Sequence, residues 1–159
     1  GMEPAVKPAS LARSDGHILA LATRPTLNLE KFSTLMKLYG EGVIPLEGKG
    51  LVEIVERGEA DSEKARDALQ ALFAPYLQDK IDGIVLGCTH YPFLRRQIEA
   101  FFPDAKIFDG REGTVRQLAR KLAEYNCLTD NTADGKIEIE SSGGEACVQL
   151  MRALFEKDI

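Results

Sequence analysis

Short, almost continuous apolar runs alternate along the chain with segments whose apolar residues recur at helical spacing. The strand-like runs are HILALA (17–22), VIPL (43–46), DGIVLGC (82–88) and AKIFDG (105–110). Helical spacing is found in the segments 28–39, 50–58, 62–78, 92–102 and 113–125. Apolar strands that are each followed by a helix favour a parallel sheet covered on both faces. We therefore expect a three-layer α/β/α fold.

Turn and capping residues set the expected helix ends. Asn28 is expected to cap the helix that runs to Tyr39, where Gly40 and Gly42 stop it. Asp61 is expected to cap the helix of 62–78, and Pro75 to end or kink that helix.

The carboxyl-terminal part follows a different pattern. Residues 126–135 are rich in turn formers and indicate a surface connection, and 145–157 has helical spacing. In KIEIE (136–140) two isoleucines alternate with lysine and glutamates, which predicts a half-exposed strand at an edge or in an incomplete sheet.

Composition narrows the class of protein. The 159 residues carry a net charge of −5, so nucleic acid and an anionic membrane are poor partners. No apolar run approaches the roughly 18 residues of a spanning helix, and the first ten residues contain no signal-like apolar core. Three widely spaced cysteines with no CxxC argue against a disulfide framework or a zinc site, and the simplest setting is a reducing cytoplasm.

The strongest chemical signal is GIVLGCTHYP (83–92), where a buried-type strand ends in a thiol followed by polar residues. Loops gather at the carboxyl ends of parallel strands, and ligands bind there. Cys88 stands at such an end, and the turn after residue 22 should share its rim. Unpaired N–H groups of the following helix favour the thiolate and, with the Thr89 hydroxyl, suit a small carboxylate. His90 suits proton transfer near neutral pH.

Each of these residues also has a plain structural interpretation. A cysteine that ends an apolar strand is most often a small buried hydrophobe, and a histidine in a turn is most often solvated. The combination at one sheet edge favours a site at Cys88 and His90. Cys127 and Cys147 lie in or beside helical apolar patterns and are expected to be packing residues.

The motif GCTH (87–90) resembles that of the glutamate racemases in the aspartate/glutamate racemase superfamily. The resemblance runs from end to end and includes LATRPT (21–26), LVEIVERG (51–58) and GKIEIESSGG (135–144). It implies an α/β/α racemase lobe and a cofactor-independent, two-base interconversion of L- and D-glutamate. It also implies D-glutamate supply for peptidoglycan, a cytoplasmic location, and no metal or other cofactor.

The same resemblance assigns roles to individual residues. Cys88 matches the cysteine that removes the α-proton of L-glutamate, His90 assists it, and Glu56 matches an acidic residue near it. Thr89, Thr23 and Thr26 match substrate contacts. Pro25, between the last two, departs from the usual small residue.

The family's first lobe, with its DSG-like and CNTA-like motifs, has no counterpart in the sequence. We expect residues 1–109 to form the second lobe and residues 110–159 to be a segment that completes the first lobe. The chain alone is then expected to be inactive for lack of the first catalytic cysteine, and to form a homodimer or associate with the absent lobe. Two alternatives remain: another Cys–His enzyme such as an amidase or thioesterase, and a non-catalytic carboxylate-binding or interaction module.

Overall fold

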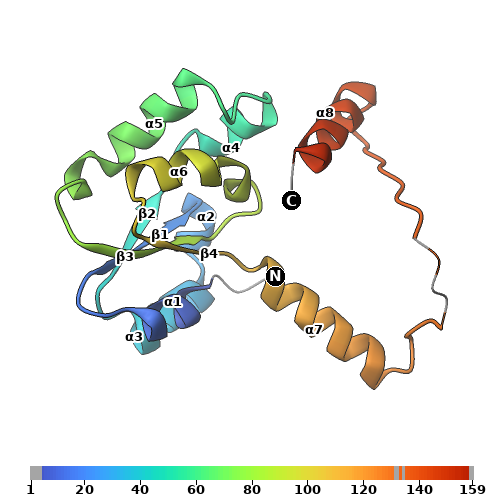
Figure 1. Ribbon diagram of the computed structural model, residues 1–159, viewed down its shortest axis with the longest axis horizontal. Helices are drawn as coiled ribbons and strands as arrows, with labels where there is room; N and C mark the ends of the chain where they lie inside the picture. The colour runs from blue at the N-terminus through green and yellow to red at the C-terminus, as the bar shows by residue number, and fades with distance from the viewer. Residues whose placement is uncertain (1–4, 131–132, 134, 158–159) are drawn as a thin grey trace. The chain divides into compact units, whose positions relative to one another are not determined.

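The computed structural model describes residues 5–130, 133 and 135–157. The chain divides into two compact units, residues 1–111 and residues 112–159. Figure 1 shows the elements of both units along the chain.

The first unit is built on a four-stranded sheet. Its strands are β1 (His17–Ala22), β2 (Val43–Glu47), β3 (Ile81–Leu86) and β4 (Lys106–Phe108). Their order is β2-β1-β3-β4, and every pair is parallel. The two central strands, β1 and β3, are almost wholly buried, which explains their continuous apolar runs. The four strand predictions and the expected fold class are confirmed.

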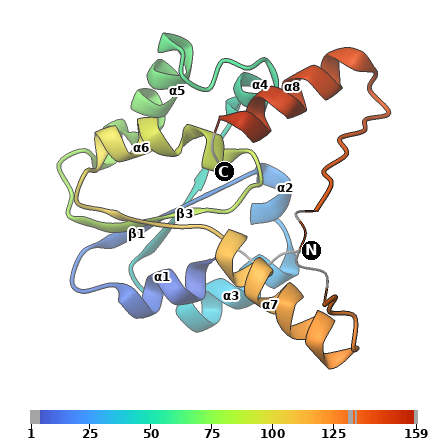
Figure 2. The ribbon, with the colours of Figure 1, turned by 45° about the vertical axis from the view of Figure 1, so that its right-hand side comes forward.

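Helices cover both faces of this sheet, as Figures 1 and 2 show. One face carries α1 (Val6–Ala12) and α3 (Glu30–Tyr39), and the other carries α4 (Leu51–Glu56), α5 (Glu63–Phe73) and α6 (Arg95–Phe101). Under α1 and α3 lies a cluster of buried residues that includes Ala9, Phe32, Leu35, Ile18, Ala20 and Val85. The sequence pattern did not predict α1.

The ends of two helices differ from the expected ones. Asn28 does not begin α3. It is the C-terminal cap of the short helix α2 (Arg24–Leu27), and its N–H donates a hydrogen bond to the carbonyl oxygen of Arg24. The cap of α5 is Ser62 and not Asp61, because the extended Ser62 places its hydroxyl 3.2 Å from the N–H of Ala65. Both cap predictions were therefore wrong.

A carboxylate at the opposite edge of the sheet fixes the entry into β1. Asp82 accepts hydrogen bonds from the N–H groups of Ser14 (2.7 Å) and Gly16 (2.9 Å). A Cβ on Gly16 would lie 2.5 Å from the carbonyl oxygen of Lys80, so only glycine fits this approach. Burial opposes ionisation, but the hydrogen bond from the Ser14 hydroxyl, the two backbone hydrogen bonds and the charge of Lys80 outweigh it and lower the pKa of Asp82.

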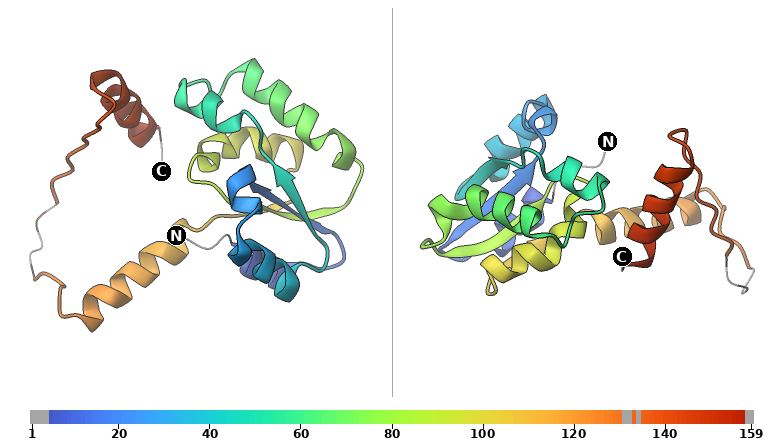
Figure 3. Two further views of the ribbon diagram at one scale, coloured as in Figure 1. Left: turned by 180° about the vertical axis from the view of Figure 1, so that it is seen from behind. Right: turned by 90° about the horizontal axis from the view of Figure 1, so that it is seen from above.

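The second unit contains α7 (Arg111–Glu124, whose first residue still belongs to the first unit) and α8 (Glu145–Glu156). Figure 3 gives two further views of these helices and of the first unit. None of the described residues after Arg111 is buried. The predicted strand 136–140 does not form, because an alternating segment becomes a strand only with a neighbour to pair with, and Ile137 remains 65% exposed.

Two further results concern the cysteines and the membrane. Cys127 and Cys147 are both exposed, so their assignment as packing residues was wrong. In the part of the chain that the structure describes, no helix has the length and apolar character needed to cross a membrane.

Candidate active site

The carboxyl ends of the two central strands place polar loops side by side. Leu21 of β1 is in register with Leu86 of β3, and the N–H of Gly87 is donated to the carbonyl of Leu21 at 2.7 Å. Thr23 and Cys88 both follow within two residues of this pair, in the segments that leave β1 and β3. A Cβ on Gly87 would lie 2.7 Å from the Leu21 oxygen, so a glycine is needed just before the cysteine.

Cys88, His90 and Glu56 form a continuous line of side chains. The Sγ of Cys88 lies 3.8 Å from Nδ1 of His90, and Nε2 of His90 lies 3.2 Å from a carboxylate oxygen of Glu56. The tautomer with its proton on Nε2 donates it to Glu56 and leaves Nδ1 as an acceptor facing the sulfur. The structure thus brings together the three residues expected to act as acid–base groups.

This line lies at the surface of the unit and not in its core. Cys88 is half-buried, and the His90 and Glu56 side chains are 31% and 60% exposed. Even with His90 protonated, a pair with that exposure adds only about 0–1 kcal/mol of stability. The contact therefore contributes little to the stability of the fold.

The three threonines lie in two segments: Thr23 precedes α2, Thr26 lies within it, and Thr89 follows Cys88. The hydroxyl oxygens of Thr23 and Thr26 are 3.0 Å apart at the start of α2. Pro25 occupies the first turn of that helix, a position where proline is favoured. Thr89 lies with its hydroxyl oxygen 3.5 Å from Nδ1 of His90.

The helix expected to follow Cys88 is divided in two. A 3₁₀ turn, η2 (Tyr91–Leu94), comes first, and α6 starts only at Arg95. The N–H groups of Tyr91 and Phe93 are already donated to the carbonyls of Cys88 and His90. These two N–H groups are therefore not free to hold a carboxylate. That other N–H groups of this segment do so, together with the Thr89 hydroxyl, stays a prediction.

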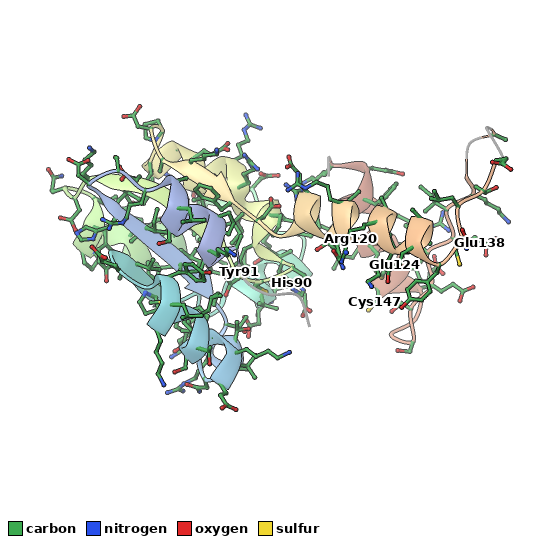
Figure 4. The ribbon with its side chains drawn as sticks, turned by 90° about the horizontal axis from the view of Figure 1, so that it is seen from below. His90, Tyr91, Arg120, Glu124, Glu138 and Cys147 are labelled. Carbon is green, nitrogen blue, oxygen red and sulfur yellow. The ribbon has the colours of Figure 1, made fainter. Side chains whose placement is uncertain are left out.

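Sequence reasoning missed Tyr91, whose side chain is fully buried beside this loop. Its hydroxyl donates to the carbonyl oxygen of Gly48 at 3.2 Å. Figure 4 shows Tyr91 next to His90. The sequence carries no local signal for this contact, because it joins residues 43 positions apart.

A second missed residue is Asp109, just beyond β4 at the same edge of the sheet. It accepts hydrogen bonds from the backbone N–H and the guanidinium of Arg111, both at 3.0 Å, and Arg95 lies 3.8 Å away. Burial raises the pKa of Asp109, but the hydrogen bonds and charges of these arginines outweigh burial, and the net pKa is lowered. Its side chain is 10% exposed, so it anchors the chain at the start of α7.

The residues described in the structure include no group of three or more His, Cys, Asp and Glu side chains able to hold a metal ion. The described side chains at this edge offer a thiol, an imidazole, a carboxylate and hydroxyl groups.

Comparison with known proteins places the chain in a family. The family model for Asp/Glu/Hydantoin racemase matches residues 1–118. The chain belongs to the Asp/Glu/Hydantoin racemase family. Among curated proteins, it is 43% identical to a glutamate racemase of Clostridium perfringens and 40% identical to one of Herpetosiphon aurantiacus, in each case over 98% of the chain.

Solved structures agree with this assignment. Escherichia coli glutamate racemase, crystallised in complex with L-glutamate and the activator UDP-MurNAc-ala, has a TM-score of 0.75 and 26% identity over 97% of this chain and 60% of its own. Isoform RacE1 from Bacillus anthracis has a TM-score of 0.67 and 26% identity over 82% of this chain and 50% of its own. The chain spans 62% and 63% of the lengths of the two curated relatives.

Proposed function

We propose that this chain carries one of the two acid–base groups of a cofactor-independent glutamate racemase, which interconverts L- and D-glutamate. The observation that carries the proposal is the line from Cys88 through His90 to Glu56 at the carboxyl edge of the sheet. The names of relatives about 40% identical to the chain support glutamate as the substrate.

In this mechanism the Cys88 thiolate takes the α-proton of L-glutamate and returns it in the opposite direction. His90 accepts or returns the thiol proton through Nδ1, while Glu56 holds the imidazole through Nε2. An α-hydrogen is very weakly acidic, so hydrogen-bond donors at the substrate carboxylate must stabilise the developing negative charge. The hydroxyls of Thr23, Thr26 and Thr89 are the donors we assign to this task.

Racemisation requires a second acid on the opposite face of the α-carbon. Residues 1–111 contain one cysteine, Cys88. We propose that the second group comes from a lobe that corresponds to the part of the relatives that this chain does not match. Residues 1–109 would then be one racemase lobe, and residues 110–159 would help to complete the other.

The test compares the 159-residue chain with a chimaera that adds the uncovered part of the Clostridium perfringens relative. Deuterium incorporation from solvent at the glutamate α-carbon is measured by NMR, together with optical rotation. We expect turnover only in the chimaera, and a loss of about 100-fold or more on Cys88→Ser. Cys147→Ser is the matched control, because this thiol is exposed and belongs to the second unit.

Each contrary result has a definite meaning. Robust turnover by the 159-residue chain alone refutes the requirement for a second lobe. Full activity of the Cys88→Ser chimaera refutes the role of the thiol. A covalent acyl adduct on Cys88 assigns the chain to nucleophilic Cys–His enzymes instead.

Three further proposals concern the use of the product, the cellular location and the association of the chain. The product D-glutamate would serve peptidoglycan synthesis, and the unpaired state of all three cysteines supports a cytoplasmic setting. The exposed apolar residues of α7 and α8 support association with another lobe or a second copy of the chain. Light scattering that shows a stable monomer at high concentration would contradict self-association.

A further inference from the structure

Tyr91 connects the loop that carries the thiol to the helix that carries the carboxylate. Its buried hydroxyl donates to the carbonyl oxygen of Gly48, in the turn between β2 and α4. The same oxygen also accepts the N–H of Leu51, the first residue of α4, at 3.2 Å. The phenol is thus bonded to the beginning of the helix whose last residue is Glu56.

The turn at Gly48 is itself fixed to the sheet. The N–H of Gly48 is donated at 3.0 Å to the carbonyl oxygen of Ala22, the last residue of β1. A Cβ on Gly48 would collide with the Tyr91 hydroxyl and lie 2.7 Å from its Cζ. The phenol therefore packs against the backbone of a residue without a side chain. The end of β1 and the start of α4 together set the position of its ring.

Two contacts join the Cys88 loop to α4, and they differ in burial. The contact between His90 and Glu56 is open to water on both sides, whereas the contact between Tyr91 and Gly48 is buried. Solvent screens the first, and both of its side chains retain rotamer freedom. The buried contact is consequently the one that sets the distance between the two segments.

The electrostatic surroundings keep the phenol a hydrogen-bond donor. Burial raises the pKa of Tyr91, and the negative charges of Cys88, Glu53 and Glu47 raise it further. The hydroxyl stays protonated over the working pH range of an enzyme, so the bond to Gly48 persists when the thiol ionises.

We propose that Tyr91 is a positioning residue for the acid–base site: it holds the Cys88–His90 loop against α4 so that His90 meets Glu56. This inference rests on the proposed function, in which Cys88 exchanges a proton with His90. It assigns no chemical step to the phenol.

The experiment uses the whole 159-residue chain and requires no racemase activity. Alkylation of each cysteine by iodoacetamide is followed across pH by peptide mass spectrometry, with the exposed Cys127 and Cys147 as internal standards. We expect Tyr91→Phe to change the alkylation rate of Cys88 several-fold. The pH dependence of that rate should then match the one measured in the Glu56→Gln variant. The double variant should then add nothing further, because both changes break one connection.

Tyr39→Phe is the matched control, since this half-buried tyrosine packs against the apolar cluster under α1 and α3. It should leave the Cys88 profile unchanged. A folded Tyr91→Phe chain whose Cys88 profile overlays that of the unchanged chain would overturn the positioning role. A Cys88 profile that ignores both His90→Asn and Glu56→Gln would refute the proposed function instead, because the thiol would then have no proton partner there.

A second variant approaches the same contact from the other side. Gly48→Ala places a methyl group against the Tyr91 hydroxyl, so it should perturb the Cys88 profile while Tyr91 is present. In the Tyr91→Leu background, which lacks the ring atoms that this methyl group would meet, the added effect of Gly48→Ala should be smaller. An equal effect in both backgrounds would contradict a direct coupling between residues 48 and 91.

Discussion

Two helices of similar length and amphipathic pattern, α5 and α8, differ in whether their apolar side chains are buried. In α5, Ala65, Leu69 and Phe73 are buried, and Phe73 makes edge-on ring contacts with Phe101 and Phe102 at 5.7 and 5.0 Å between ring centroids. In α8 no residue is buried, and Phe155 is 48% exposed. An apolar stripe stabilises a helix only when another surface covers it. The first unit provides that surface for α5, and the described residues of the second unit do not provide one for α8.

The same contrast between the first and the second unit is tested most sharply by a pair of leucines, one in α5 and one in α7. Leu69→Ala in α5 removes a fully buried side chain and should lower the free energy of unfolding by about 2–5 kcal/mol. Leu118→Ala in α7, where the side chain is 57% exposed, should change it by no more than about 0.5 kcal/mol. Urea unfolding followed by circular dichroism measures both. Equal losses would break the comparison.

A smaller effect is expected on how the stability of the first unit depends on pH. The pKa of Asp109 is lowered in the folded protein, so its contribution is present above the ordinary value of 3.8 and is lost as the pH falls through the lowered pKa. Asp109→Asn should therefore destabilise the first unit by about 1–2 kcal/mol at pH 7, and by less in strong acid. Thermal unfolding at a series of pH values measures this difference.

Asp104→Asn provides the control for that experiment, because Asp104 is an exposed carboxylate in the turn before β4. It should leave the pH dependence of stability almost unchanged. If Asp109→Asn destabilises the protein equally at every pH, the loss comes from packing and not from the charge.

Next in size is the cap of α5. Ser62→Ala removes the hydroxyl that accepts the N–H of Ala65 and should lower the free energy of unfolding by about 1 kcal/mol. Ser33→Ala, on the exposed side of α3, should cost nothing or stabilise slightly, because alanine has the higher helix propensity. The same urea titration compares them, and a neutral Ser62→Ala would show that the capping bond contributes no net stability.

The smallest effect is expected in α7. Glu112 and Arg116 form an i,i+4 pair at 3.1 Å with side chains 85% and 75% exposed. Glu112→Gln should change helix content or stability by about 0.5 kcal/mol or less, and less still at high salt. Circular dichroism at two salt concentrations tests this. A large loss would mean that the second unit has tertiary support absent from the described residues.

The sequence by itself determined the strands, the parallel sheet and the edge where the chemistry lies. Continuous apolar runs leave few alternatives to buried parallel strands, and the direction of the chain then decides at which edge Cys88, His90 and Thr23 emerge. The family resemblance added Glu56, which periodicity alone would have left as a solvated charge in an acidic helix.

Only the tertiary structure decided which residues meet. The choice of Ser62 over Asp61 depends on where the backbone is extended, and the contact of Tyr91 with Gly48 joins residues 43 positions apart. No local pattern encodes such a pairing, because it arises from the way the turn before α4 folds onto the end of β1. The strand predicted at 136–140 failed for the same physical reason: alternation specifies which side of a strand is apolar, but a strand exists only when a neighbour accepts its hydrogen bonds.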